Sequence, residues 1–362
     1  MNATFEPSDV FDTVVVGAGI TGLTCARALV TAGQSVLVLE GRSRVGGRLL
    51  SDPATGLDLG ASWFWPNEPR INAEIASLAI PTHQQHLAGD AMYEGPDGVQ
   101  RLDGNPIDVA SGRFSIGADS LALALRSAMP GADVRLEHTV TDVQARDSTM
   151  LTTTATSRLG SRTEPSSRHV VLALPPSLAI QGITFDPPLT HQLARLMEIT
   201  PVWMGAVTKV VAVYGEPFWR IAGLSGAAIS HVGPMREIHD MSGPGGTPAA
   251  LFGFVSSASP TQPTVTPTEI LDQLTTLFGS IAGEPDHLLI HDWRNEPLTS
   301  PPGVELLSAY QTYGDRRFGE PAMDGRLIIA STETSPVAPG HIEGAIHAGR
   351  EAAATVLDSV SS

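Results

Sequence analysis

Cysteine and lysine are each nearly missing from the 362-residue chain, and each scarcity excludes classes of functional site. The single cysteine, Cys25, cannot form an intrachain disulfide, a CxxC redox pair or a cysteine-based zinc cluster. The single lysine, Lys209, lies in the sequence Thr208-Lys209-Val210, which fits neither a Walker A loop nor a protein-kinase active site. Every other one of the 22 basic residues is arginine, so the position of the one lysine needs a chemical reason.

Long apolar stretches and an excess of positive charge are also missing. No apolar run approaches the roughly 18–20 residues that span a bilayer, and the N-terminal sequence MNATFEPSDV lacks the basic and apolar regions of a signal peptide. We therefore expect a cytoplasmic protein that does not contact a membrane. The 38 acidic residues outnumber the 22 basic ones and give a formal net charge of −16, which argues against nucleic acid as a partner.

What is present begins with a strand, a turn, a helix and a second strand within the first forty residues. DTVVV at 12–16 and SVLVLE at 35–40 have the continuous apolar character of buried strands, and LTCARALVTAG at 23–33 has helical spacing. The turn before the helix reads Gly17-Ala18-Gly19-Ile20-Thr21-Gly22, a GxGxxG pattern. This order predicts a Rossmann-like βαβ unit that binds a dinucleotide.

Each part of this unit has a physical role in holding a dinucleotide. Gly17 permits the tight turn, Gly19 allows the backbone to approach a pyrophosphate, and Gly22 allows the helix to pack on the strand. The first N–H groups of the helix and the positive end of its dipole attract phosphate. Glu40, which ends the second strand, can accept hydrogen bonds from a ribose 2′-OH and would repel a 2′-phosphate, which argues against NADP.

A second glycine–arginine motif follows the ribose acid. The chain continues with Gly41-Arg42-Ser43-Arg44-Val45-Gly46-Gly47-Arg48 and then with Asp58-Leu59-Gly60-Ala61-Ser62-Trp63. A basic surface loop is the alternative interpretation of GRSRVGGR. With these residues the chain resembles the flavin-containing amine oxidase family, monoamine oxidase-like proteins with a GR2-type FAD site, in which an R-x-G-G-R motif follows the ribose acid. The resemblance implies FAD as the cofactor and a second set of pyrophosphate contacts from this loop.

The resemblance extends over most of the chain. Family-like segments are HVVLALPPSL at 169–178, MGAVTKVVAVYGEPFW at 204–219, HDWRNEP at 291–297 and LIIASTETSPVAPGHIEGAIHAGREAAATVL at 327–357. By this match Val140 contacts the adenosine end of FAD, Glu333 and Thr334 contact the ribitol–phosphate region, and Ile342 lies beside the isoalloxazine. The resemblance thus implies a cofactor-binding set made of Gly17, Gly19, Ile20, Thr21, Gly22, Glu40, Gly41, Arg42, Gly47, Arg48, Gly60, Ala61, Ser62, Trp63, Val140, Trp293, Glu333, Thr334, Gly340, His341 and Ile342.

Four interpretations compete for Lys209, which has apolar neighbours at almost every position of VTKVVAVY. It could reach solvent from a sheet edge, form a Schiff base with pyridoxal phosphate, or anchor an anionic substrate. The family resemblance implies the fourth, in which a lysine on this strand holds a water against flavin N5, assists reoxidation by O₂ and takes part in proton handling. Burial lowers the pKa of an ammonium, whereas arginine stays charged, so lysine suits this role and Lys209 is the candidate catalytic residue.

The predicted substrate pocket departs from the family pattern. His341 stands in GHIEGA where an aromatic side chain, commonly tyrosine, is expected, so the aromatic pair that frames the amine in relatives is absent or rebuilt. We expect Trp63, His341 and Phe218 to contact the substrate. TSPPGVE at 299–305 contains no cysteine for a thioether to the flavin, so FAD is expected to be non-covalent.

The segment between residues 81 and 114 is short compared with that of larger relatives. It contains little beyond a predicted hairpin, AMYEGPDGVQRL, which turns at 95–98. HQQH at 83–86 is interpreted as a loop, and no metal site is predicted. We expect a pocket that is more open than in those relatives, or one closed by another subunit of a homodimer.

The sequence thus predicts an α/β protein with a Rossmann-like FAD-binding domain and a smaller substrate domain of mixed sheet and helices. Residues 1–81, 114–187 and 317–362 are assigned to the first domain, and residues 82–113 and 188–316 to the reduced second domain. The predicted activity is oxidation of a small-molecule amine by hydride transfer to flavin N5, giving an imine and then a carbonyl, with O₂ reduced to H₂O₂. The alternatives are a desaturase or C–C oxidase on the same scaffold, and a flavin-bound interaction protein without turnover.

Overall fold

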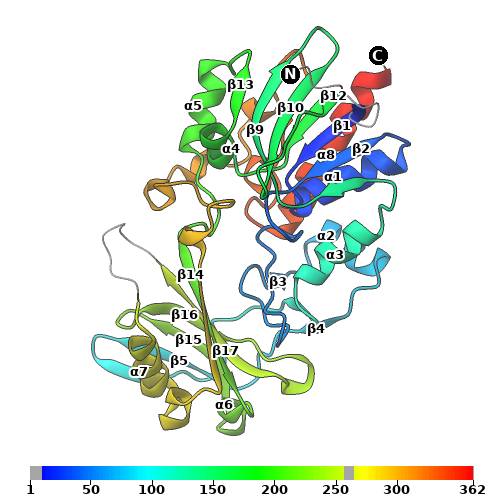
Figure 1. Ribbon diagram of the computed structural model, residues 1–362. Coiled ribbons are helices and arrows are strands. Elements are labelled where there is room, and N and C mark those ends of the chain that lie inside the picture. Colours follow the sequence, from blue (N-terminus) through cyan, green and yellow to red (C-terminus); the bar gives the residue numbers. More distant parts are fainter. Residues whose placement is uncertain (1–9, 257–264, 362) are drawn as a thin grey trace.

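The computed structural model describes residues 10–256 and 265–361, in which the strands form three sheets and helices pack against the two larger ones (Figure 1). The first sheet has the strand order β13-β9-β10-β12-β1-β2-β8, with β11 beside β10 and β19 beside β12. Strands β1, β2, β8, β12 and β19 pair in parallel, as the predicted βαβ unit requires. The strands are β1 (Val10–Val16), β2 (Val36–Leu39), β8 (Asp133–Arg135), β9 (His138–Ala145), β10 (Leu151–Ser157), β11 (Arg162–Thr163), β12 (Ser166–Leu172), β13 (Thr184–Asp186) and β19 (Leu327–Ile329).

Both faces of the first sheet are buried, because helices pack against each of them, and successive side chains of a strand enter opposite faces. On one face Val15 and Val38 pack with α1 (Ile20–Thr31), α3 (Asp119–Ser127) and α8 (Ile342–Ser361). On the other face Val14 and Leu37 pack with α4 (Pro176–Gly182) and α5 (His191–Ile199). Strands covered on both sides are apolar throughout, which is why they could be recognised in the sequence. The predicted α/β class with a Rossmann-like domain is confirmed.

The second sheet contains Lys209 and has the order β18-β14-β17-β16-β15-β5-β6. Its neighbouring strands are antiparallel except for the parallel pair β15–β5, so the sheet is mixed, as predicted. The predicted hairpin corresponds to β5 and β6. The strands are β5 (Asp90–Gly95), β6 (Gly98–Arg101), β14 (Val207–Tyr214), β15 (Leu224–Ser230), β16 (Met235–Asp240), β17 (Ala249–Ser256) and β18 (His287–Asp292).

Strand β14 separates the core of the second sheet from the side that carries Lys209. Val210 and Ala212 point to one face, where they pack with α6 (Phe218–Ile221) and α7 (Pro267–Phe278). Val211 and Val213 belong to a different apolar cluster on the other face. Because side chains alternate along a strand, Lys209 shares the face of Val211.

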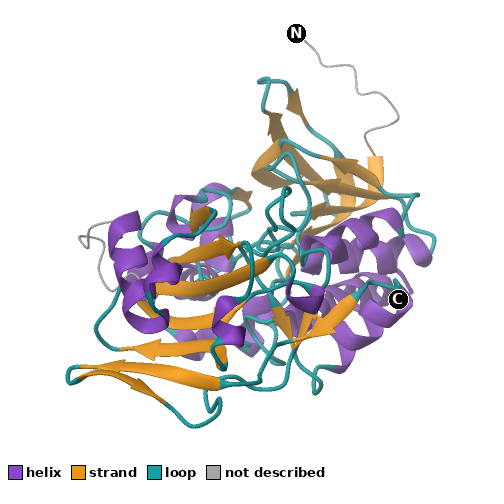
Figure 2. Cartoon of the chain, turned by 90° about the horizontal axis from the view of Figure 1, so that it is seen from below, coloured by secondary structure: helices purple, strands orange, loops and turns teal. Residues whose placement is uncertain are grey.

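A small third sheet, β3-β7-β4, joins the segments around residues 63, 83 and 113. Its strands are β3 (Trp63–Phe64), β4 (Thr82–Gln84) and β7 (Gly112–Phe114), and α2 (Pro69–Ser77) follows β3. The prediction that residues 83–86 form a loop is therefore wrong for His83 and Gln84, which pair with β7. Loops gather between the two larger groups of strands in the second view (Figure 2).

Helix α5 packs on the other side of the boundary that the sequence suggests at residue 188. It begins after that boundary, yet Leu193, Leu196 and Met197 pack in the core of the first sheet. Helix α5 therefore packs with the predicted FAD-binding part, although its residues were assigned to the substrate part. Among the described residues, no helix combines the length and apolar character that crossing a membrane requires.

Candidate active site

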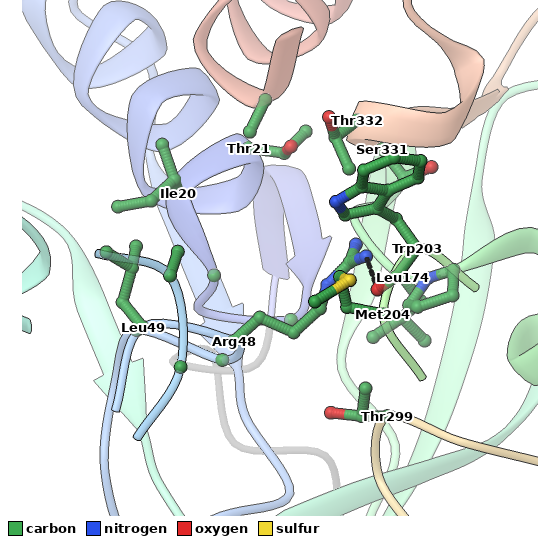
Figure 3. Close-up of a pocket in the computed structure, with 18 of the residues that line it drawn as sticks. Ile20, Thr21, Arg48, Leu49, Leu174, Trp203, Met204, Thr299, Ser331 and Thr332 are labelled. Atoms are coloured by element: carbon green, nitrogen blue, oxygen red, sulfur yellow. Dashed lines mark hydrogen bonds between the residues drawn. The ribbon is translucent and has the colours of Figure 1, made fainter. Parts of the chain in front are cut away.

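A cavity of about 700 Å³ lies where the glycine-rich turn, the arginine loop, strand β14 and the start of α8 converge. Figure 3 shows side chains from distant segments around this space, including Thr21, Arg48, Trp203 and Thr332. Of the residues predicted for the site, the cavity wall contains Gly17, Gly19, Ile20, Thr21, Glu40, Gly41, Arg42, Gly47, Arg48, Gly60, Ala61, Ser62, Trp63, Val140, Lys209, Trp293, Gly340, His341 and Ile342.

The glycine-rich turn has room for a phosphate group. A Cβ on Gly22 would lie 1.9 Å from the Gly17 carbonyl oxygen, so Gly22 serves the contact between helix and strand. A Cβ on Gly19 would meet no atom within 4 Å, so this backbone is open toward the cavity. No side chain within residues 10–256 and 265–361 caps the N-terminus of α1, which leaves its first N–H groups available. The turn therefore fits a dinucleotide pyrophosphate.

The Glu40 carboxylate is held at the end of β2 by two backbone donors. Ala18 N–H donates to Glu40 Oε2 at 2.8 Å, and Arg42 N–H donates to Oε1 at 2.8 Å. The side chain is buried and lines the cavity together with Val140. Each carboxylate oxygen accepts more than one hydrogen bond, so Glu40 retains acceptor capacity for ribose hydroxyls.

The three arginines of the loop have different partners. Arg42 Nη2 bonds to Glu296 Oε2 at 2.9 Å, and Arg42 also bonds to the Thr299 hydroxyl. Arg44 turns inward and donates to the carbonyls of Val45, Gly47 and Leu49, so it shapes the loop and does not belong to the cavity wall. Arg48 lines the cavity and reaches the backbone oxygen of Trp203 (Figure 3).

Glu333 and Thr334 lie beside the cavity rather than in its wall. Glu333 is fully buried and forms a two-point ion pair with Arg48, whose second contact, Nη2 to Oε2, is 3.0 Å. The Thr334 hydroxyl donates to the Ser331 carbonyl at 3.0 Å and accepts from Ser331 N–H. Ser331 and Thr332 line the cavity instead. The contact of Glu333 and Thr334 with the ribitol–phosphate region stays a prediction, and their side chains support the neighbouring wall.

Lys209 is buried in the interior of the second sheet. It pairs with Phe254 of β17 and His291 of β18, and it is 1% exposed, which rules out a lysine that reaches solvent from a sheet edge. Its Nζ donates to the Gly60 carbonyl at 2.9 Å and to the Ser62 hydroxyl, and lies 4.5 Å from the centroid of the Phe252 ring. Burial lowers the pKa of Lys209 to about 7.

A buried ion pair that the sequence did not indicate lies behind Lys209. Arg113 Nη2 is 3.8 Å from Asp58 Oδ2, and both side chains are almost completely buried. Burial raises the pKa of Asp58, and the Arg113 guanidinium opposes this shift. The Asp58 carboxylate in turn favours the charged form of Lys209, whereas Arg113 disfavours it. The pair therefore helps to set the charge of Lys209.

Aromatic rings form one side of the cavity. His341 packs 4.8 Å from Trp65 and 6.5 Å from Trp203, measured between ring centroids. Trp63 lies 6.4 Å from both Trp65 and Phe254, so the rings follow one another toward Lys209. Aromatic rings thus line the cavity although His341 stands at the position where an aromatic side chain is expected. Trp65, Trp203 and Phe254 also line the cavity and were not predicted. Trp203 and Phe254 are distant in sequence from the motifs and give no local signal of sharing a wall, whereas Trp65 lies two residues after Trp63.

Phe218 does not line the cavity, contrary to its predicted contact with substrate. It begins α6 and packs 5.2 Å from Tyr214 and 5.1 Å from Trp219 in the core of the second sheet. Its apolar ring is buried there because it lies on the α7 side of the sheet. Trp293 does line the cavity, and its indole N–H donates to the Leu59 carbonyl at 3.0 Å.

Comparison with known proteins identifies the family of the chain. The family model "Flavin containing amine oxidoreductase" matches residues 92–357, and a model for an NAD(P)-binding Rossmann-like domain matches residues 15–78. The chain belongs to the flavin-containing amine oxidoreductases. It is therefore a flavin-dependent oxidoreductase, and the cavity fits a dinucleotide at the glycine-rich turn.

Several members of this family are similar over nearly their whole length. The putative flavin-containing monoamine oxidase AofH of Mycobacterium tuberculosis is 27% identical, with 98% of each chain covered. Putrescine oxidase of Kocuria rosea is 27% identical, with 97% of this chain and 96% of the relative covered. Both alignments, of 451 and 466 residues, are longer than the 362-residue chain, so these flavin-containing amine oxidoreductases contain segments that it lacks.

Solved structures share the fold. A putrescine oxidase bound to putrescine has a TM-score of 0.82 at 22% identity and covers 96% of this chain and 99% of its own. Cyclohexylamine oxidase from Brevibacterium oxydans IH-35A has a TM-score of 0.81 at 22% identity, with 97% of this chain and all of the other covered. This amine oxidoreductase therefore keeps the family fold despite its shorter chain.

Proposed function

We propose that the chain oxidises a small primary amine at its C–N bond, using FAD and O₂ and releasing H₂O₂. The single observation that supports this proposal most strongly is the position of Lys209. The only lysine is buried in the wall of the cavity that contains the dinucleotide turn, and its Nζ is fixed by Gly60 and Ser62. When bound, FAD supplies a two-electron acceptor that takes a hydride from the amine carbon and passes the electrons to O₂.

Lys209 supplies a proton-exchanging group at a fixed position. With its pKa lowered to about 7 by burial, Nζ is present in both protonation states near neutral pH. Its two hydrogen bonds direct the group without neutralising it, since both partners are uncharged. A water held by Nζ would be oriented and could receive or provide a proton, which an arginine could not do.

The aromatic wall orients the amine and excludes water. Trp63, Trp65 and Phe254 offer flat apolar surfaces and π faces that attract a cationic amine. Glu237 also lines the cavity and belongs to the row Lys209–Phe254–Glu237 across three neighbouring strands. Its pKa is lowered, chiefly by His239, whose Nε2 lies 3.7 Å from Glu237 Oε2, so it is a carboxylate at neutral pH. A positively charged aliphatic amine fits this wall better than an anionic substrate.

The relatives guide the choice of test substrates. One of them is a putrescine oxidase and a structural neighbour is a cyclohexylamine oxidase, so linear diamines and cyclic amines are the first compounds to examine. The holoenzyme is mixed without oxygen with putrescine, cyclohexylamine, benzylamine and several amino acids, and the absorbance of oxidised flavin is followed. We expect bleaching with at least one amine, and H₂O₂ in step with aldehyde or ketone once air is admitted.

A flavin that stays oxidised with every amine would overturn this function. Flavin bleaching by a compound that can be oxidised only at a saturated C–C bond would instead support the desaturase alternative. A flavin that neither class of compound reduces would support an interaction protein without turnover. Acid precipitation tests the attachment of FAD, which we expect to leave the protein without a covalent link. A cytoplasmic location and a homodimer stay predictions, to be checked by cell fractionation and light scattering.

A further inference from the structure

The structure places one histidine at the cavity wall with a buried carboxylate behind it. His341 Nδ1 lies 2.7 Å from Glu68 Oε1, and the Glu68 side chain is only 7% exposed. The second oxygen of Glu68 accepts from the Trp65 N–H at 2.9 Å, and Glu68 is the residue that precedes α2. The carboxylate is thus fixed and cannot turn away from the imidazole.

This contact determines which ring nitrogen faces a ligand. The Glu68 carboxylate can only accept a hydrogen bond, so Nδ1 carries the hydrogen. The neutral ring therefore has its lone pair on Nε2. Nε2 has no hydrogen-bond partner among the described residues, although His341 lines the cavity. Packing between Trp65 and Trp203 holds the ring plane. The arrangement is that of an oriented proton acceptor with a charged group behind it.

Amine oxidation needs such an acceptor. An alkylamine resembles the lysine side chain, whose pKa is about 10.4, so at neutral pH it reaches the site as an ammonium. An ammonium has no lone pair on nitrogen, and that lone pair is what stabilises the carbon as a hydride departs. We propose that His341 is the base that removes a proton from the substrate ammonium, with Glu68 as the positioning residue behind it.

The step balances without any further reactant. The N–H bond of the ammonium breaks, its electron pair stays on the amine nitrogen, and the lone pair of Nε2 binds the proton. The resulting imidazolium is stabilised by the Glu68 carboxylate and later loses its proton to water. This inference rests on the proposed amine oxidation, because only a substrate that arrives as an ammonium needs the step.

Other groups near the cavity are less suited to the task. Lys209 is 1% exposed and its Nζ is already engaged with Gly60 and Ser62. Glu237 is a weaker base, because its pKa is lowered. The charged groups around His341 itself are Glu68, the Arg48–Glu333 pair that bonds the Trp203 backbone, and the Arg70–Glu343 pair at the start of α8.

The test compares flavin reduction by one amine over a range of pH, without oxygen, in the wild type and in His341→Gln. Glutamine keeps a polar side chain but cannot take a proton. We expect the rate at neutral pH to fall about 100-fold. The rate should recover toward pH 10, where the amine is neutral in solution, and added imidazole should restore part of it at pH 7. The exposed His231, which contacts Tyr93, provides the control variant His231→Gln, with an unchanged profile.

Glu68→Gln gives an independent readout because it keeps His341. The variant retains an acceptor for Nδ1 but removes the charge, so the rising limb of the pH profile should move to lower pH by about one unit. Equal pH profiles in the wild type, His341→Gln and Glu68→Gln would overturn the role of His341. A wild type that no amine reduces would instead refute the amine oxidation itself, so the two failures are distinguishable.

Discussion

Arg48 and Glu333 form a two-point ion pair that joins residues 285 positions apart. Each partner also bonds the same third residue, since Arg48 donates to the Trp203 carbonyl and Glu333 accepts from the Trp203 N–H at 3.1 Å. The pair therefore ties the arginine loop, the segment before β14 and the segment before α8 into one wall. Burial alone would raise the pKa of Glu333, but Arg48 more than offsets this effect, so its pKa lies below the usual value.

Glu333→Ala should destabilise the protein by about 3 kcal/mol, because it leaves a mostly buried guanidinium without its partner. FAD content should fall with it, since Arg48 lines the cofactor cavity. Urea unfolding and the ratio of flavin to protein absorbance measure the two effects. Glu198→Ala removes the exposed Arg195–Glu198 pair as a control and should cost less than about 1 kcal/mol. Equal losses in both variants would contradict the role of the buried pair.

Substitution by alanine should have different effects on folding and FAD binding at two glycines of the turn. Gly22→Ala places a methyl 1.9 Å from the Gly17 carbonyl oxygen and should prevent folding of the βαβ unit. Gly19→Ala meets no protein atom and should fold normally, yet bind FAD at least about tenfold more weakly, because the methyl enters the space left for the pyrophosphate. Circular dichroism and FAD titration separate these outcomes. Gly319→Ala, at an exposed and open position, is the control. Normal FAD affinity in Gly19→Ala would contradict the placement of the pyrophosphate.

Lys209→Met should change how stability depends on pH. The folded-state pKa of Lys209, about 7, is below the value of about 10.4 in an unfolded chain. Between these values the unfolded chain binds more protons, so wild-type stability should rise with pH in this window, and the Lys209 contribution to this slope should be missing in the variant. Urea midpoints from pH 6 to 10 measure the difference. Parallel curves for the two proteins would show that folding does not lower the pKa of Lys209.

Phe218→Ala should affect stability and leave substrate binding alone. The ring is 9% exposed in the core of the second sheet, and its removal should cost about 3 kcal/mol. The KM for the best amine and the flavin spectrum should not change, because Phe218 lies outside the cavity wall. Thermal unfolding and steady-state kinetics check this. A raised KM without a loss of stability would restore Phe218 to the substrate site.

Local sequence was enough to predict the βαβ unit and its dinucleotide turn. Strands covered on both faces are apolar throughout, and the turn glycines have spacing that backbone geometry requires. Lys209 could be singled out by its rarity, and the structure places it in the cavity wall.

The partners of these residues could not be predicted, because each is brought close only by the tertiary fold. Glu68 and His341 are 273 positions apart. Arg113, the ion-pair partner of Asp58, lies on β7 of the small third sheet. A single sequence contains no pattern that links such pairs. Phe218 was wrongly predicted to contact the substrate. It follows the lysine strand closely in sequence, but the turn after Tyr214 places it on the α7 side of the sheet.

The central claim is that bound FAD oxidises an amine and that Lys209 then assists its reaction with O₂. Double-mixing stopped flow tests this most directly: the holoenzyme is reduced without oxygen by the best amine and then mixed with aerated buffer, in the wild type and in Lys209→Met. We predict that the amine reduces the flavin in both proteins and that oxidised flavin returns at least about tenfold more slowly in Lys209→Met. Equal rates of return would contradict the claim.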